Sequence, residues 1–425
     1  MANVSFRQAS AHQRRTRLFH YASSEHSDLT QPLTAPATSS ANLGGPAAVK
    51  VNNFVGLKAI VLDPVNILCI FTPIGVASSM LGWSPAVVFG TNFIALIPLA
   101  KILGDATEEL AVGLRNDTLG GLLNATFGNA VEMILTVQSL MKGLVTVVKG
   151  TLLGSVLSNL LLVLGMSFFF GGIGHLGKEQ EFKETGPMTN MSMLLLACAA
   201  FAMPTVFEEG FKQQFEKEEL QSTVLEISRV VSIFLLLSYI CFLVFQMYTH
   251  LSIFESEGGE DADEPTINVP TSLTLLLVST LLVALNSEYL VGSIEGVVSS
   301  YSVSSSFIGV ILLPIVGNAC EHASAIRMCI IDKPEIAIGI AVGSCTQIAL
   351  FVVPFAVIVG WCMGVSMDLD FGMLGVVILV LSVIIAMSIV VNGKSNWLEG
   401  LMLQLTYLIV AVVYWFDPTP GQGSG

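Results

Sequence analysis

Long apolar runs, each about as long as a membrane-crossing helix, alternate with short polar connections along most of the chain. A helix that crosses the hydrocarbon core of a bilayer needs about 20 mostly apolar residues. The pattern therefore predicts an all-α polytopic membrane protein with about 11 transmembrane helices. The predicted spans are residues 63–82, 85–104, 119–141, 148–171, 188–207, 228–250, 271–291, 307–330, 335–364, 371–391 and 397–416.

The composition agrees with this class of protein. Only 12% of the 425 residues are charged and 53% are hydrophobic, whereas a soluble domain carries about 25% charged residues. The seven cysteines lie in or beside apolar segments at irregular spacing, so they indicate neither a disulfide framework nor a thiolate metal site. The formal net charge of −14 comes largely from two acidic stretches, around 175–230 and at 255–264, and does not suggest a nucleic-acid partner.

The distribution of basic residues predicts the orientation. Residues 1–53 are polar, contain several arginines and show no cleavable signal peptide, so we expect a disordered cytosolic tail. With the N-terminus in the cytosol, thirteen of the 18 lysines and arginines fall on the inner side and five on the outer side. The positive-inside rule therefore predicts a cytosolic N-terminus and a luminal C-terminus.

One motif occurs twice. Gly-Asn-Ala-Val-Glu at 128–132 returns as Gly-Asn-Ala-Cys-Glu at 317–321, an offset of 189 residues. Gly154-Ser155 and Gly343-Ser344 keep the same offset, as do Gly120 and Gly309. The two motifs lie on the third and eighth predicted spans, so five crossings separate them. Because five is odd, the copies enter the membrane from opposite sides. This is an inverted-topology repeat, which is typical of secondary transporters.

A weaker match lies upstream of the repeated motif. Thr107 to Val112 resembles Ser287 to Gly292, although the offset falls to 180. This match suggests Glu108, Glu109 and Glu288 as acidic positions near an ion pathway; simple helix-end charges are the alternative.

The repeated motif carries the chemistry of a cation site. A carboxylate at the bilayer centre costs about 2.5–3.5 kcal/mol on insertion scales, and two facing carboxylates oppose each other's ionisation. Glu132 and Glu321 are therefore the expected metal and proton sites. Calcium prefers carboxylate, amide and carbonyl oxygens, whereas His and Cys ligands would favour transition metals. The oxygen-bearing residues on the same helix faces are Asn129, Asn318, Ser155, Ser344 and Gln347.

A coupling mechanism follows as a hypothesis. The doubly ionised pair of Glu132 and Glu321 binds one divalent cation, and the doubly protonated pair is neutral. Both states reorient across the membrane, whereas a half-loaded site keeps a net charge and crosses poorly. Exchange of cation against proton results.

At these motifs the sequence resembles the calcium/proton exchangers of fungal and plant vacuoles, within the cation/calcium exchanger superfamily. The resemblance implies a Ca²⁺/H⁺ antiporter, with Mn²⁺ as a second cation in some relatives, in the membrane of a vacuole or other acidic organelle. It also implies an extra first helix followed by two inverted five-helix repeats. The corresponding domains are a tail at 1–53, the first helix at 54–84, a repeat at 85–250, an acidic cytosolic segment at 251–270, a second repeat at 271–416 and a C-terminal tail at 417–425.

The resemblance further implies a calcium-responsive segment in the cytosol. Its acidic residues are Glu255, Glu257, Glu260, Asp261, Asp263 and Glu264. A solvated linker is the alternative for this segment. No cofactor is expected; the expected partners are Ca²⁺ and H⁺ as substrates, Ca²⁺ as a regulatory ion, and the lipid bilayer.

Three other functions remain open from the sequence. A sodium-coupled calcium exchanger uses a similar pair of acidic repeats. A calcium channel would usually build its acidic filter from several subunits. An intramembrane hydrolase would need an activated nucleophile, and neither His-Glu-x-x-His nor Gly-x-Ser-x-Gly occurs. We therefore expect a transporter and not an enzyme.

Overall fold

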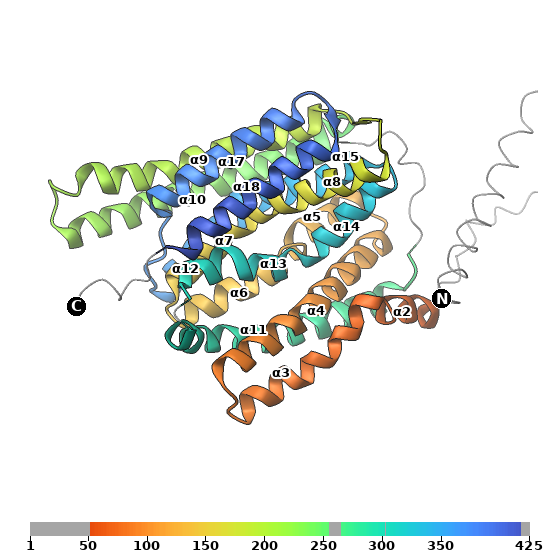
Figure 1. The fold of residues 1–425 in the computed structure, drawn as a ribbon, viewed down its shortest axis with the longest axis horizontal. Helices are drawn as coiled ribbons and strands as arrows, with labels where there is room; N and C mark the ends of the chain where they lie inside the picture. The colour runs from red at the N-terminus through yellow and green to blue at the C-terminus, as the bar shows by residue number, and fades with distance from the viewer. Residues whose placement is uncertain (1–51, 255–264, 302, 418–425) are drawn as a thin grey trace, which may run out of the picture. The chain divides into compact units, whose positions relative to one another are not determined.

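The protein is a bundle of long helices (Figure 1). The computed structural model describes residues 52–254, 265–301 and 303–417. The helices up to the acidic segment are α2 (Asn53–Val61), η1 (Pro64–Ile70), α3 (Phe71–Met80), α4 (Pro85–Gly113), α5 (Asp117–Phe127), α6 (Ala130–Met141), α7 (Val145–Leu157), η2 (Ser158–Val163), α8 (Leu164–Gly174), α9 (Thr185–Phe211), α10 (Lys217–Val244), η3 (Phe245–Thr249) and η4 (Leu251–Ile253).

The remaining helices follow the acidic segment. They are α11 (Val269–Tyr301), α12 (Ser305–Phe307), η5 (Ile308–Leu312), α13 (Leu313–Gly317), α14 (Ala319–Ile330), α15 (Pro334–Gln347), η6 (Ile348–Val352), α16 (Val353–Met363), α17 (Gly372–Val390) and α18 (Trp397–Trp415). The described residues also contain two short strands, β1 (Gln180–Glu181) and β2 (Lys394–Ser395), which pair antiparallel. The all-α prediction is therefore confirmed.

The predicted spans coincide with these helices. Eight continuous helices in the described residues are long and apolar enough to cross a membrane. Two bent pairs, Asn53–Val61 with Pro64–Met80 and Ser305–Gly317 with Ala319–Ile330, bring this number to as many as ten. The remaining predicted range, 119–141, falls on α5 and α6, which are individually short and are separated by Gly128 and Asn129.

Local sequence explains where several helices begin. Pro85 stands at the first position of α4, where its missing N–H is not needed. Asp63 accepts a hydrogen bond from the Val65 amide and caps η1, and Asn396 forms a capping box with Glu399 at the start of α18. These caps fix the helix starts at both ends of the chain.

The spans that carry the repeated motif are interrupted. Asn129 lies between α5 and α6 with backbone angles outside the helical region, and Asn318 lies between α13 and α14. The second break bends its helix pair by 58°. The neighbouring spans contain π-helical turns, η2 after α7 and η6 after α15. Such turns are frequent at functional sites.

The bundle buries two apolar clusters. One is formed mainly by α7 to α9 and α14 to α18, and the other by α4, α6, α11 and α13. Figure 1 shows α3, α4 and α11 side by side along one side of the bundle, with α9, α10 and α17 along the opposite side. Both interrupted spans lie between these two groups, so the breaks are placed in the interior.

Candidate cation site

Glu132 is enclosed by protein. It lies in the first turn of α6, directly after the break, and only 1% of its surface is exposed. Neither carboxylate oxygen has a hydrogen-bond partner among the described residues. Its Oε1 lies against Gly317, where an added Cβ would come within 2.5 Å of that oxygen. Glu132, from the first copy of the motif, therefore contacts the helix break that precedes Glu321 in the second copy.

Glu321 occupies the equivalent place in the first turn of α14. It lines a cavity of about 910 Å³ that also reaches Asn129, Ser344 and Gln347. Its Oε2 has no hydrogen-bond partner in the described part of the chain. The two carboxylates are thus not equivalent, since Glu132 is not among the residues that line the cavity.

Side-chain amides connect the breaks to the facing helices. The Asn129 amide donates to Gln347 Oε1 at 2.7 Å, and the Asn318 amide donates to the Ser155 carbonyl at 3.2 Å. Both asparagines keep a buried carbonyl oxygen that has no hydrogen-bond partner in the described part of the chain. Since each amide N–H is engaged, its remaining oxygen is available as an acceptor or as a cation ligand.

The two serines complete this polar lining. Ser155 is fully buried and its hydroxyl has no hydrogen-bond partner among the described residues. Ser344 accepts a hydrogen bond from the Asn159 amide at 2.9 Å. Asn159 was not among the predicted site residues. Its counterpart at the repeat offset of 189 is Ile348, so only its place beside Ser155 and Ser158 could have indicated it.

The candidate site has more neutral oxygen donors than carboxylate groups. Within the described ranges, no three His, Cys, Asp or Glu side chains form a metal-holding group. A cation between the breaks would therefore complete its coordination with amide, hydroxyl and carbonyl oxygens or with water. This donor set fits calcium, which accepts such ligands in flexible geometry.

The three predicted pathway residues are placed differently from one another. Glu108 lines the cavity. Glu109 instead accepts hydrogen bonds from the Thr266 amide at 2.8 Å and hydroxyl at 2.6 Å, so it ties the segment before α11 to α4. Glu288 is exposed on α11 and is not among the lining residues.

The predicted regulatory segment lies outside the described residues, since Glu255, Glu257, Glu260, Asp261, Asp263 and Glu264 all fall within 255–264.

Other charged residues at the cavity were missed by the sequence analysis. They are Asp63, Lys101, Asp105, Arg327 and Glu335. Lys101 and Asp105 are four residues apart and form an ion pair at 2.7 Å. Their spacing in the sequence indicates a pair on one helix face, but it does not indicate that the pair contacts a cavity.

The opposite side of the site is closed by direct backbone contact. An added Cβ on Gly150 of α7 would lie 3.2 Å from the Gly309 Cα, and one on Gly154 would overlap the Val310 carbonyl. We call this contact between α7 and η5, at Gly150 and Gly309, the seam. Next to Gly150 in the chain, Lys149 forms an ion pair with Asp368 at 2.5 Å. In contrast, Gly339 and Gly343 of α15 have open space in front of them and line the cavity. The cavity therefore extends along α15, whereas α7 packs directly against η5.

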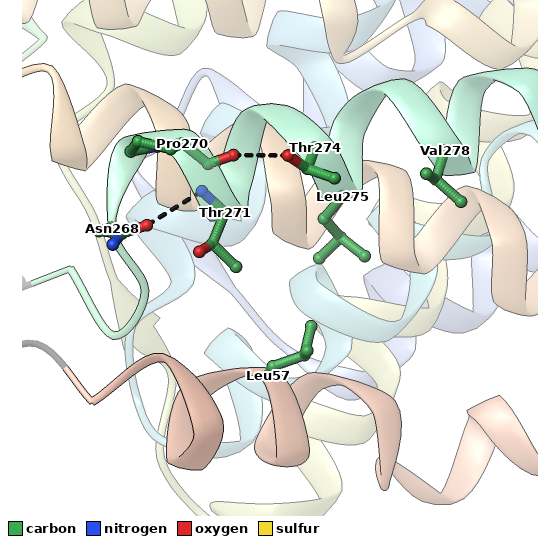
Figure 2. Close-up of a pocket in the computed structure, with 7 residues that line it drawn as sticks. All are labelled: Leu57, Asn268, Pro270, Thr271, Thr274, Leu275 and Val278. Carbon is green, nitrogen blue, oxygen red and sulfur yellow. Dashed lines mark hydrogen bonds between the residues drawn. The ribbon is translucent and has the colours of Figure 1, made fainter.

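A second hollow, of about 390 Å³, lies between α2 and the start of α11. Figure 2 shows Leu57 facing Leu275 and Val278 across it. The Thr271 amide donates to Asn268 Oδ1 just before α11, and the Thr274 hydroxyl donates to the Pro270 carbonyl. No carboxylate lines this hollow, so it does not have the ligands of a cation site.

Buried carboxylates at paired helix breaks inside a bundle of membrane helices are typical of secondary transporters. A family model described as sodium/calcium exchanger protein matches residues 84–248 and 271–416. The chain belongs to this family of membrane exchangers.

Several relatives resemble the chain over most of its length. The Ca(2+)/H(+) antiporter of Synechocystis is 42% identical over 370 residues, covering 83% of this chain and 97% of that protein. The vacuolar calcium ion transporter of Schizosaccharomyces pombe is 38% identical, covering 86% and 88%. Vacuolar cation/proton exchanger 3 of Arabidopsis thaliana is also 38% identical, covering 88% and 84%.

Solved structures show the same architecture. The structure of native YfkE matches with a TM-score of 0.70 and 37% identity, covering 83% of this chain and 99% of that one. The crystal structure of the H+/Ca2+ exchanger CAX matches with a TM-score of 0.61 at 13% identity, covering 82% and 91%, which supports the fold alone.

Proposed function

We propose that this protein is a secondary active antiporter that exchanges Ca²⁺ for H⁺ by alternating access. The observation that carries the proposal is the meeting of the two motifs: the unpartnered Glu132 carboxylate lies against Gly317 of the break that precedes Glu321. Relatives called Ca(2+)/H(+) antiporter and vacuolar cation/proton exchanger support this choice of ions.

The chemistry of the pair explains the coupling. Burying an ionised carboxylate without a partner is unfavourable, and neither Glu132 oxygen has one. A bound divalent cation, or a proton on each carboxyl group, removes this cost. The site therefore favours a loaded state with calcium or a loaded state with protons, and exchange between the two couples their fluxes.

The positions of Glu132 and Glu321 along their helices favour a cation bound between ionised carboxylates. Glu132 and Glu321 lie in the first turns of α6 and α14, where the helix dipole favours negative charge. The preceding short helices α5 and α13 end at the same breaks. Their C-terminal carbonyl ends favour cations, so both halves of each interrupted span contribute to binding.

The cavity supports a conformation open to one face. If the N-terminus is cytosolic, as the basic residues predict, the cavity opens to the cytosol and the seam of Gly150 and Gly309 closes the luminal side. We also propose that residues 85–250 and 271–416 are inverted repeats. The two separate matches of the family model support this division.

We place the protein in the membrane of a vacuole or another acidic organelle. The vacuolar transporters among its relatives support this location. In such a membrane the proton gradient, acidic inside, would drive calcium into the lumen. Calcium binding by the acidic segment at 255–264 remains a proposal that rests on the resemblance.

Sodium-coupled calcium exchange is the second candidate, because the family description includes sodium. The test uses purified protein in sodium-free, acid-loaded vesicles. We expect calcium uptake that depends on the pH gradient and is abolished in Glu132→Gln and in Glu321→Gln. The matched control is Glu295→Gln, which changes an exposed acid on α11. Substantial uptake by either site variant, or a requirement for sodium, would contradict the proposal.

A further inference from the structure

Lys101 lies among the acidic residues that line the same cavity as Glu321. The Lys101 ammonium contacts Asp105 at 2.7 Å and Asp63 at 3.5 Å. All three side chains are partly exposed, at 19%, 25% and 29%, and all three line the cavity. The ammonium therefore occupies a place between two carboxylates that an entering cation could otherwise use.

The lysine stands on the helix face that leads to the site. Lys101, Asp105 and Glu108 are spaced by four and three residues, so they share one face of α4, and all line the cavity. This face packs against α14 beside the site, because an added Cβ on Gly104 would lie 2.9 Å from the Cys320 sulfur. Cys320 directly precedes Glu321 in the chain.

The second carboxylate comes from the extra first helix. Asp63 stands at the 74° bend between α2 and the following span. Its Oδ1 accepts from the Val65 amide at 3.0 Å, which leaves Oδ2 directed to Lys101. The cap thus fixes Asp63 in place, and the first span contributes a charge to a cavity lined mostly by residues of 85–250 and 271–416.

Lys101 strongly affects the net charge of the cavity lining. The cavity lining contains five carboxylates, Asp63, Asp105, Glu108, Glu321 and Glu335, and two basic side chains, Lys101 and Arg327. A cavity whose lining has a net negative charge concentrates cations and speeds their arrival. Removing the Lys101 charge changes the net lining charge from −3 to −4 without touching either carboxylate of the site.

We propose that Lys101 sets the apparent affinity for the transported cation, acting as a tethered ammonium that competes with it for Asp63 and Asp105 at the cavity mouth. This inference rests on the proposed function. The ligand class is a divalent cation, because two carboxylates that face one ammonium would hold a divalent ion more strongly than a monovalent one.

The experiment measures the KM and the maximal rate of calcium uptake in acid-loaded vesicles at low ionic strength. Lys101→Gln is expected to lower the KM about 3- to 10-fold with little change in maximal rate. Asp63→Asn is expected to raise the KM, since asparagine keeps the helix cap but loses the charge. The double variant should return near the wild-type KM. Raising ionic strength with choline chloride should shrink each difference, because salt screens exposed charges.

Two controls separate this inference from others. Lys58→Gln removes an exposed lysine of α2 that does not line the cavity, and it should leave the KM unchanged. If wild-type vesicles show no proton-driven calcium uptake, the proposed function fails. If uptake is normal and lost in Glu321→Gln, but Lys101→Gln raises the KM, leaves it unchanged or lowers only the maximal rate, then Lys101 is a structural ion pair and the inference is overturned.

Discussion

At the scale of single residues, the repeated motif indicates Glu132 and Glu321 as the candidate site but does not distinguish them. Their motifs differ at one position in five, so the sequence predicts a nearly symmetric pair. In the structure Glu132 is enclosed and Glu321 lines the cavity. This difference arises from the conformation of the whole bundle, which places the same residues of the two copies in different surroundings. Lys101 and Asp63 were missed for the same reason, because their contact joins two separate helices.

The close approach of Gly317 to Glu132 gives a prediction at this scale. Gly317→Ala would place a methyl group 2.5 Å from Glu132 Oε1, and such overpacking costs about 1 to 3 kcal/mol. We expect calcium uptake to fall about tenfold, measured as initial rate in vesicles with equal amounts of folded protein. Gly90→Ala is the matched control, because nothing lies within 4 Å of the added group. Normal uptake by Gly317→Ala would show that Glu132 does not need its observed position.

At the scale of helices, the sequence predicted the spans well and their interruptions poorly. Each predicted range falls on a helix or helix pair, since apolar runs determine which segments enter a bilayer. Both breaks lie at the Gly-Asn pair that opens the repeated motif. The π-helical turns η2 and η6 were not predicted, because they depend on packing against neighbouring helices rather than on local composition.

The seam between α7 and η5 should open during transport if access alternates. In a variant with the exposed Cys241 and Cys362 changed to serine, Gly150→Cys with Gly309→Cys places two thiols at the closed side. We expect an oxidant to cross-link them and stop calcium uptake, and a reductant to restore it. The pair Gly120→Cys with Gly339→Cys occupies the equivalent repeat positions and should cross-link only during turnover. Full transport by the oxidised first pair would contradict alternating access at this seam.

The loop between α16 and α17 provides a prediction about pH. Burial opposes ionisation of Asp370, but hydrogen bonds from the Thr205 hydroxyl, the Glu208 carboxyl group and the Gly372 amide, together with the Lys149 charge, hold the pKa of Asp370 below its ordinary value. A lowered pKa in the folded state means that ionised Asp370 stabilises the protein. This stabilisation is present above the ordinary pKa of about 3.9 and is lost as pH falls through the lower folded value.

Asp370→Asn should therefore lower the Tm in detergent at pH 7 by about 2 to 5 °C, and the difference from wild type should shrink only below about pH 4. Thermal unfolding across a pH series checks this. Asp417→Asn, at the end of the described chain, should have no such effect. A difference that disappears already at pH 5 to 6 would contradict the assigned direction. Over the pH range of an acidic organelle Asp370 should stay ionised.

At the scale of the whole molecule, hydropathy and the inverted motif predicted an exchanger fold, and the family match and the solved structure of native YfkE agree with it. What the sequence could not provide is the conformation. A single chain with inverted repeats can open to either face, and the two states share the same apolar pattern. The open space at Gly339 and the close contact at Gly150 are therefore properties of the folded state, and they fit the account's central claim, that one site exchanges calcium for protons.

The most direct test of that claim follows calcium and protons together in one preparation. Purified protein is placed in sealed, sodium-free vesicles with an acidic interior, and external calcium is added while calcium entry and internal pH are recorded. We predict that calcium entry and proton exit begin together and stay in fixed proportion, that both are lost in Glu321→Gln, and that replacing calcium with sodium produces neither. Calcium entry without proton movement, or proton exit that only sodium elicits, would contradict the assignment.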